Sequence, residues 1–385
     1  MGANPLLGVF LHWLGGLASA SFYVPYRKVR GWSWETYWLA GGVVSWIVAP
    51  WVMAGLLTHD LLPVLRGAPA SSIFWSYVFG VLWGLGGLTF GLTMRYLGLS
   101  LGMAVALGYT AVFGTLVPPI FHRQFMQLLT QRSGVIILVG VGICVVGILF
   151  AGAAGISKEK ELSHEQKLAS IREFNLKLGL GVATFCGIMS SCFAFGLDAG
   201  NPIKLLTLAH GTSVMWQGLP VLVVVLAGGF TTNFVWCAAL NVRNRSYGEY
   251  LRIPQSIARL AVGEHPPLEN VVDAASTEMA LELATDPHSP PSLSWNYLFS
   301  AIAGATWYMQ FFFYTMGETQ MGHYKFSSWT LHMASIIIFS TLWGIALKEW
   351  RGVSTRTKVL VFLTLLTLVG STVIVGYGNY LGIHP

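Results

Sequence analysis

Long apolar runs recur along the whole chain, and their recurrence limits the fold more than any other feature. A helix needs about 20 largely apolar residues to cross the hydrocarbon core of a bilayer. Runs of this kind cover residues 6–26, 36–57, 73–94, 96–121, 134–156, 178–197, 205–240, 294–317, 326–347 and 359–381. The sequence therefore predicts an all-α integral membrane protein.

The composition excludes most soluble classes of protein. Only 10% of the 385 residues are charged and 54% are hydrophobic, whereas a soluble domain carries about 25% charged residues. Lys and Arg exceed Asp and Glu by 22 to 16, but they are scattered between the apolar runs, as in cytoplasmic loops of membrane proteins. We therefore expect no nucleic-acid partner. The four cysteines lie inside apolar runs without CxxC or zinc-ligand spacing, so neither disulfides nor a metal site are expected.

The run over residues 205–240 decides the number of spans. As one helix it would extend roughly 54 Å, which exceeds a hydrocarbon core of about 30 Å. Basic residues concentrate on the cytoplasmic side of membrane proteins. Ten spans place 17 of the 22 basic residues on one face, whereas eleven spans divide them 10 to 12. We therefore predict ten spans, with 205–240 as one long, tilted or partly interfacial helix bent near Gly228 and Gly229, and with both termini external.

The spans fall into two groups of five, which predicts an internal repeat. The first repeat covers 1–157, a cytoplasmic connector covers 158–177, and the second repeat covers 178–385 with a cytoplasmic insertion at 241–294, in which 268–285 is predicted to form an amphipathic helix. Four residues recur at an offset of 171: Gly8, Gly16, Ser19 and Phe22 match Gly179, Gly187, Ser190 and Phe193. An odd number of spans inverts the second copy, and inverted repeats are common in transporters, with the substrate site near the midplane between them.

Several strings rich in aromatic and polar residues add a family resemblance. They are SASFYVPYRKVRGWSWETYW at 19–38, GLTMRYLG at 91–98, EFNLK at 173–177, WYMQFFFY at 307–314, SWTLHM at 328–333 and LKEW at 347–350. Together they resemble the L-rhamnose–proton symporter family of the drug/metabolite transporter superfamily. The resemblance implies ten helices in two inverted halves, a location in the cell inner membrane, and proton-coupled sugar uptake by alternating access.

Ionisable side chains inside or beside the apolar runs are the candidates for proton coupling, because charge is costly in hydrocarbon. His12 and His332 lie inside the first and ninth runs, and histidine titrates near neutral pH; the alternative is a hydrogen-bonded packing role. Glu35 opens the second run and is a third candidate, although a carboxylate is also favoured at a helix N-terminus. Arg27 and Arg95 are candidate gating partners, and the preference of basic residues for the cytoplasmic face also explains them.

Sugar recognition requires aromatic rings for the apolar faces of a pyranose and a few polar groups for its hydroxyls. The eighth run holds the densest set of both, and Gln310 follows Trp307 by three residues, which places them on nearly the same helical face. Interfacial anchoring is the alternative role for tryptophans. The predicted substrate-binding residues are Trp307, Tyr308, Gln310, Tyr314, Trp83, Ser19 and Tyr23.

These observations and the resemblance together predict an importer of L-rhamnose with a proton. The sequence has no HExxH, GxSxG, paired-carboxylate or phosphate-loop motif, so we expect no enzyme and no cofactor apart from the coupling proton. Two alternatives remain open: an exporter or exchanger of another small metabolite, and a membrane sensor that uses the 241–294 insertion. The expected partners are the sugar, the proton and the bilayer, and the oligomeric state is open.

Overall fold

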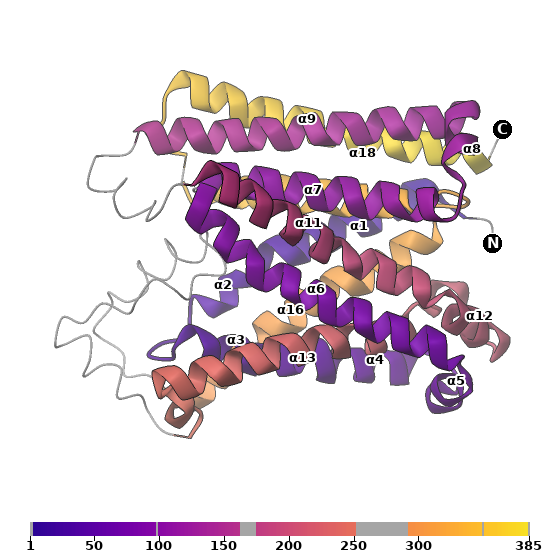
Figure 1. The fold of residues 1–385 in the computed structure, drawn as a ribbon, viewed down its shortest axis with the longest axis horizontal. Coiled ribbons are helices and arrows are strands. Elements are labelled where there is room, and N and C mark those ends of the chain that lie inside the picture. The colour runs from indigo at the N-terminus through magenta and orange to yellow at the C-terminus, as the bar shows by residue number, and fades with distance from the viewer. Residues whose placement is uncertain (1–2, 98, 162–174, 252–291, 349, 384–385) are drawn as a thin grey trace.

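The computed structural model describes residues 3–97, 99–161, 175–251, 292–348 and 350–383, and all regular structure in these parts is helical. The long helices run side by side along a common direction (Figure 1). In chain order they are α1 Pro5–Ser21, α2 Tyr23–Tyr26, α3 Trp34–Gly42, the π-helix η1 Val43–Val48, α4 Ala49–Leu57, α5 Leu61–Gly67, α6 Ala70–Leu97, α7 Leu99–Phe121, α8 Phe125–Thr130, α9 Arg132–Glu161, α11 Leu176–Ala199, α12 Asn201–Ala209, η2 Val214–Trp216, α13 Leu219–Asn244, η3 Ser246–Tyr250, α16 Leu293–Thr319, α17 Ser327–Ala346 and α18 Thr355–Ile383.

Nine of the described helical segments are long and apolar enough to cross a membrane. They are α1–α2, α3–η1–α4, α6, α7, α9, α11–α12, η2–α13, α17 and α18. This confirms the prediction of an all-α integral membrane protein. Helix α16, with 27 residues, is long enough to be a tenth span but buries several polar side chains, among them Asn296, Ser300 and Gln310. The count of ten spans therefore stays a prediction that depends on α16.

The prediction of one long helix over 205–240 is wrong. Helix α12 ends at Ala209, and the chain turns before α13 begins at Leu219. Gly211 adopts a left-handed φ of 83° in this turn, a conformation that glycine reaches without steric cost. Only α13 crosses the bundle, so the break adds no span to the count. Gly228 and Gly229 lie inside α13, which is a single helix from Leu219 to Asn244.

Helix packing is symmetrical between the two halves of the chain. Matching α1 with α11, α6 with α16, α7 with α17 and α9 with α18 turns each major contact into another. Thus α1 packs on α16 and α17, while α11 packs on α6 and α7, and α9 packs directly on α18. Figure 1 shows α9 and α18 lying side by side at one edge of the bundle. This exchange is what two inverted repeats would produce.

The glycines that recur at an offset of 171 sit at equivalent places in this packing. A side chain on Gly16 of α1 would collide with Ser335 of α17, and one on Gly187 of α11 would collide with Tyr109 of α7. Small residues allow membrane helices to approach this closely. The contacts support the division into 1–157, 158–177 and 178–385, which remains a proposal. Residues 162–174 of the connector and 252–291 of the insertion, including 268–285, lie outside the described residues.

Candidate functional site

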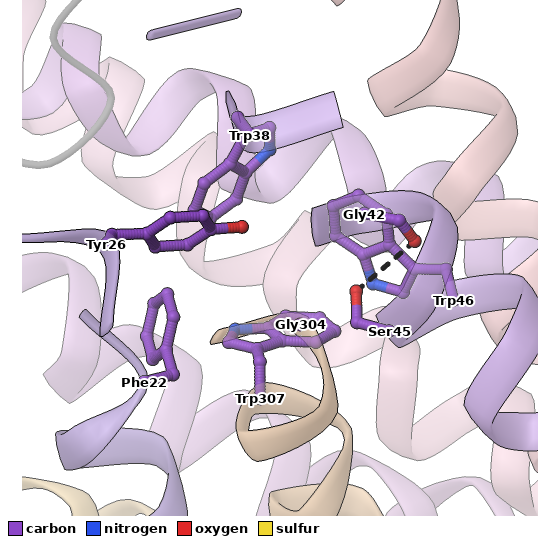
Figure 2. Close-up of a pocket in the computed structure, with 8 residues that line it drawn as sticks. All are labelled: Phe22, Tyr26, Trp38, Gly42, Ser45, Trp46, Gly304 and Trp307. Atoms are coloured by element: carbon purple, nitrogen blue, oxygen red, sulfur yellow. Dashed lines mark hydrogen bonds between the residues drawn. The ribbon is translucent and has the colours of Figure 1, made fainter. Parts of the chain in front are cut away.

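An aromatic cage lies between the end of α1 and the helices α2, α3, η1 and α16. Figure 2 shows its rings facing a common space. The cage is lined by Phe22, Tyr26, Trp38, Gly42, Ser45, Trp46, Gly304 and Trp307. The space left between them is about 10 Å³, enough for no more than about one water molecule. Ligand pockets of small molecules measure roughly 300–1,000 Å³, so this conformation has the cage closed on itself.

A π-helical turn places Trp46 in the cage. Residues Val43–Val48 form η1, and the Ser45 hydroxyl donates to the Gly42 carbonyl at 3.3 Å. Short π-helical insertions in α-helices often occur at functional sites because they redirect side chains. Gly42 is required beside this ring, since a Cβ there would lie 2.6 Å from Trp46 Cζ3. The backbone thus holds the indole of Trp46 against the neighbouring helix α16.

Trp307 is the ring around which the cage is built. Its indole meets that of Trp46 edge-on at 5.1 Å and stacks on that of Trp83 at 5.7 Å with an interplanar angle of 25°. The structure therefore brings together Trp307 and Trp83, as expected from the sequence. Tyr23 lies at the margin of the cage, stacked on Trp38 at 6.3 Å. Contact of these rings with a sugar stays a prediction.

A second group of buried side chains, the histidine cluster, consists of His12, Tyr314 and His332. The two imidazoles meet the Tyr314 ring edge-on at 5.3 Å and 5.2 Å. Both histidines are fully enclosed, and neither nitrogen of His12 nor Nδ1 of His332 has a hydrogen-bond partner among the described residues. Gly317 makes room for His12, because a Cβ there would lie 2.8 Å from its Nε2. The two candidate histidines, 320 positions apart in sequence, thus flank one phenol.

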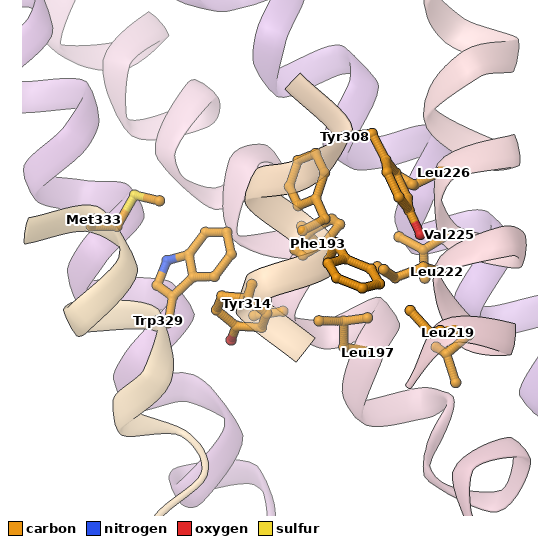
Figure 3. Close-up of a cluster of buried hydrophobic side chains, with 14 of the residues drawn as sticks. Phe193, Leu197, Leu219, Leu222, Val225, Leu226, Tyr308, Tyr314, Trp329 and Met333 are labelled. Atoms are coloured by element: carbon orange, nitrogen blue, oxygen red, sulfur yellow. The ribbon is translucent and has the colours of Figure 1, made fainter. Parts of the chain in front are cut away.

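A row of aromatic rings in edge-on and tilted contact connects the cage to the histidine cluster. Trp307 contacts Phe311 at 4.7 Å, Phe311 contacts Phe193 at 4.5 Å, and Phe193 contacts Tyr314 at 6.1 Å. Figure 3 shows Phe193, Tyr314 and Trp329 within this buried core. The cage and the cluster are therefore separate places on α16, joined by a row of apolar ring contacts.

Trp307 is the one predicted substrate residue that lines the cage itself, and four others lie away from the cage and from its neighbouring rings Trp83 and Tyr23. Tyr308 is fully buried on another side of α16, close to Leu222 and Leu226 of α13 (Figure 3). Gln310 is buried, and its backbone carbonyl faces Gly15 of α1. Ser19 is half-buried in α1 away from the cage. Tyr314 belongs to the histidine cluster instead of the cage.

Two buried carboxylates, Glu35 and Glu249, lie at one end of the bundle, called here the basic end, where Arg27 follows α2 and α13 ends with Arg243 and Arg245. Glu35 at the start of α3 accepts hydrogen bonds from Ser246 Oγ at 2.6 Å and Asn244 Nδ2 at 3.0 Å. Glu249 in η3 accepts from the Ser33 backbone N at 2.7 Å and from Ser33 Oγ at 2.8 Å. Burial, with a contribution from the charge of Glu35, raises the pKa of the Glu249 carboxyl.

The predicted gating residues also lie at the basic end. Arg27 follows α2 directly, whereas the side chain of Arg95 lies outside the described residues. Glu35 is at this end and does not contact the histidine cluster. Its partners come from the far end of α13, so the contact could not be read from the local sequence around Glu35.

Ion pairs organise the opposite end of the bundle. Lys204 Nζ of α12 lies 2.8 Å from Glu318 Oε2 of α16, and both side chains are largely buried. Two other pairs at this end are more exposed to solvent: His122 Nε2 lies 2.6 Å from Asp198 Oδ2, and His210 Nδ1 lies 3.1 Å from Asp60 Oδ2.

No group of three or more metal-ligating side chains occurs in the part of the chain that the structure describes. The four cysteines are buried and free. The expectation that the protein needs no metal stays a prediction.

Sequence reasoning missed several residues of the site. Trp46 is aimed by a π-helix, which no residue pattern reveals. Phe193 could have been found through the offset of 171, which matches it with Phe22. Phe22 lines the cage. Trp38 and Tyr26 lie within the family-like string 19–38 but carry no feature that separates a cage residue from an interfacial one.

Comparison with known proteins covers nearly the whole chain. The family model of the L-rhamnose-proton symport protein (RhaT) matches residues 1–258 and 276–381. A protein named L-rhamnose-proton symporter from Klebsiella pneumoniae (strain 342) is 34% identical over 373 residues, which are 97% of each chain. Proteins of the same name from Cronobacter sakazakii (strain ATCC BAA-894) and Yersinia pestis (strain Pestoides F) are each 33% identical; the matches cover 97% of this chain, and 97% and 98% of theirs.

Proposed function

Because the chain belongs to the L-rhamnose-proton symport family, we propose that it imports L-rhamnose together with a proton by alternating access. The observation that carries the proposal is the double role of α16, which holds the cage ring Trp307 and the cluster phenol Tyr314 on one rigid element. A helix shared by a sugar site and a proton site can transmit a change at either to the other.

The aromatic cage is the proposed sugar site. Trp307, Trp46 and Trp83 present perpendicular and stacked indole faces, which suit the apolar faces of a pyranose. Polar groups lie beside these indoles. The buried Trp46 Nε1 has no partner among the described residues, and Asn233 accepts from Trp38 Nε1 at 3.2 Å. A buried donor without a partner is unusual, and a sugar hydroxyl would satisfy it once the rings move apart.

The histidine cluster is the proposed proton site. Neutral imidazoles can remain in an apolar interior, whereas an imidazolium there is costly and must be coupled to a change of state. His12 and His332 have free nitrogens and one shared neighbour, Tyr314. Protonation of one of them would favour a different arrangement of α1, α16 and α17, which meet at the cluster. We propose no other cofactor, and the relatives' names are those of transporters and not of enzymes.

The proposed orientation follows from charge. The basic end would face the cytoplasm, in accordance with the positive-inside rule, and the end with the ion pairs would face outward in the cell inner membrane. Both termini would then be external, since Figure 1 places them at the same end of the bundle.

Uptake by purified protein in proteoliposomes tests the proposal. L-Rhamnose should accumulate when the outside is acidic and should not accumulate after a protonophore is added. Uptake unaffected by the proton gradient would exclude symport, and preferential binding of another metabolite in a panel would favour an exporter or exchanger. Trp307→Phe should weaken sugar binding, while Trp295→Phe, on the same helix but exposed, serves as the matched control.

A further inference from the structure

The pair Lys204–Glu318 differs from the other ion pairs at the opposite end in its depth. Its side chains are 5% and 14% exposed, against 43% and 33% for His122 and Asp198. Removing two full charges from water is costly. Ionisable side chains that a membrane protein buries are candidates for its transport pathway. The pair is therefore a candidate for a functional role, unlike a solvated ion pair at the surface.

The pair links the short helix α12 to the helix that carries the proposed site. Lys204 lies in α12, the nine-residue helix between the break at Gly200 and the turn before α13. Glu318 lies in the last turn of α16, one residue from Thr319, whose hydroxyl contacts Met215 of η2. The pair thus fastens the connection between α11 and α13 onto the helix that carries the cage.

Glu318 also adjoins the histidine cluster. Tyr314 lies one turn before it on the same helix, and Gly317, the preceding residue, packs directly on the His12 ring of α1. From α12 it is faced by Lys204, and from α17 the cluster is completed by His332. Along α16, Glu318 therefore lies within one helical turn of the cluster, in which neither nitrogen of His12 has a partner among the described residues.

We propose that Glu318 takes up the transported proton from outside and that Lys204 expels it inward. The inference rests on the proposed function. When α12 moves away, the hydrated carboxylate of Glu318 accepts a proton from a hydronium ion, and an O–H bond forms. When the Lys204 ammonium returns to 2.8 Å, its charge favours the carboxylate. The O–H bond breaks, and the proton passes to a lone pair on an imidazole nitrogen of His12, which forms an N–H bond.

This sequence of steps links closure to proton movement. The ion pair can form only when Glu318 has lost its proton, so sealing the outer end and loading His12 become one event. The structure, with the pair formed and the cage closed, corresponds to the stage at which the outer end is sealed. The more exposed pair His122–Asp198 cannot act in this way, because water reaches both partners in the closed state.

Glu318→Gln separates proton coupling from sugar movement. In proteoliposomes, the variant should lose accumulation driven by an acid outside, because the amide cannot carry the proton. It should still exchange labelled for unlabelled L-rhamnose at equal concentrations on both sides, which requires no net proton movement. The affinity of wild-type protein for L-rhamnose should depend on pH, and this dependence should disappear in the variant. Glu318→Asp should recover part of the accumulation.

The control is Asp198→Asn, which alters a carboxylate at the same end of the bundle and should keep gradient-driven accumulation. Lys204→Gln/Glu318→Gln removes both charges and should behave like Glu318→Gln, which covers instability of the single variant. A Glu318→Gln protein that still accumulates L-rhamnose in proportion to the gradient overturns this inference alone. Wild-type protein without gradient-stimulated uptake overturns the proposed function and the inference with it.

Discussion

The two ends of the bundle are closed by different chemistry. At the basic end, hydroxyl, amide and backbone donors converge on the buried carboxylates Glu35 and Glu249. At the opposite end, lysine and histidine side chains pair with carboxylates, as in Lys204–Glu318 and His210–Asp60. The first kind of closure has neutral donors that keep their protons across physiological pH. The second places a lysine or an imidazole against a carboxylate, at the side from which we propose that protons enter.

The difference is clearer because the two ends contain contacts at equivalent positions of the chain topology. Asp60, which follows α4, pairs with His210 in the turn before α13. Glu249, which follows α13, binds Ser33 in the turn before α3. Under the proposed inverted repeat these are the same contact made twice. One copy pairs an imidazole with a carboxylate, and the other pairs a hydroxyl and a backbone N–H with a carboxylate, so equivalent positions have acquired different chemistry.

The largest effect is expected from Lys204→Met. Removing one partner of a buried ion pair leaves an uncompensated charge, which costs about 3–5 kcal/mol of unfolding free energy. Thermal unfolding of the purified protein in detergent at neutral pH measures the loss. Lys204→Met/Glu318→Met should recover most of it, because no isolated charge remains. A single variant as stable as the double variant would show that water already reaches Glu318, and the contrast between the two ends would lose its main support.

A smaller effect is expected at the basic end from Glu35→Ala. The substitution removes the acceptor of the partly buried Asn244 amide, whereas Ser246 Oγ keeps Asn241 Oδ1 as an acceptor at 3.1 Å; one unsatisfied buried donor costs about 1–3 kcal/mol. Glu35→Gln is the matched control, since its amide oxygen still accepts a hydrogen bond. Equal thermal stability of the two variants would mean that the charge of Glu35, and not its hydrogen bonding, closes this end.

The sequence predicted the contents of the site better than its geometry. His12 and His332 stood out because ionisable groups are rare in apolar runs, and Trp307 and Trp83 because they lie in the predicted counterparts α16 and α6. Hydropathy cannot show that the two histidines share Tyr314. That contact depends on Gly317 and Gly15, which let α1 and α16 approach closely.

The errors have a common physical origin in local backbone geometry. The break after Ala209 depends on the left-handed conformation of Gly211, and the course of η3 depends on Arg245, with a φ of 57°. The turn at Gly211 divides an apolar run that we had predicted to form one helix. The turn at Arg245 brings Glu249 back toward Ser33, which lies 216 residues earlier in the sequence. An apolar pattern of helical length carries no information about either turn.

The pH dependence of Glu249 offers a finer test of the basic end. Burial raises the folded-state pKa of this carboxyl above its ordinary value of 4.5, so the folded protein holds the proton more tightly than the unfolded chain. The stability that this contributes is fully present below pH 4.5 and is lost as the pH rises through the folded-state pKa. Melting temperatures measured from acidic to neutral pH should therefore decline less steeply in Glu249→Gln than in the wild type. Parallel curves would contradict the predicted role of burial.

The smallest effect is expected from Asp198→Asn, which separates depth from charge at the opposite end. Although His122 and Asp198 are only 2.6 Å apart, both are solvated, and exposed ion pairs contribute about 0–1 kcal/mol. The variant should unfold within about 1 kcal/mol of the wild type by thermal unfolding in detergent, and added salt should reduce even this difference. If it lost as much stability as Lys204→Met, any charge at this end would contribute to closure. The burial of Lys204 and Glu318 would then no longer distinguish them, whereas a negligible loss makes depth, and not charge alone, the property that sets this pair apart.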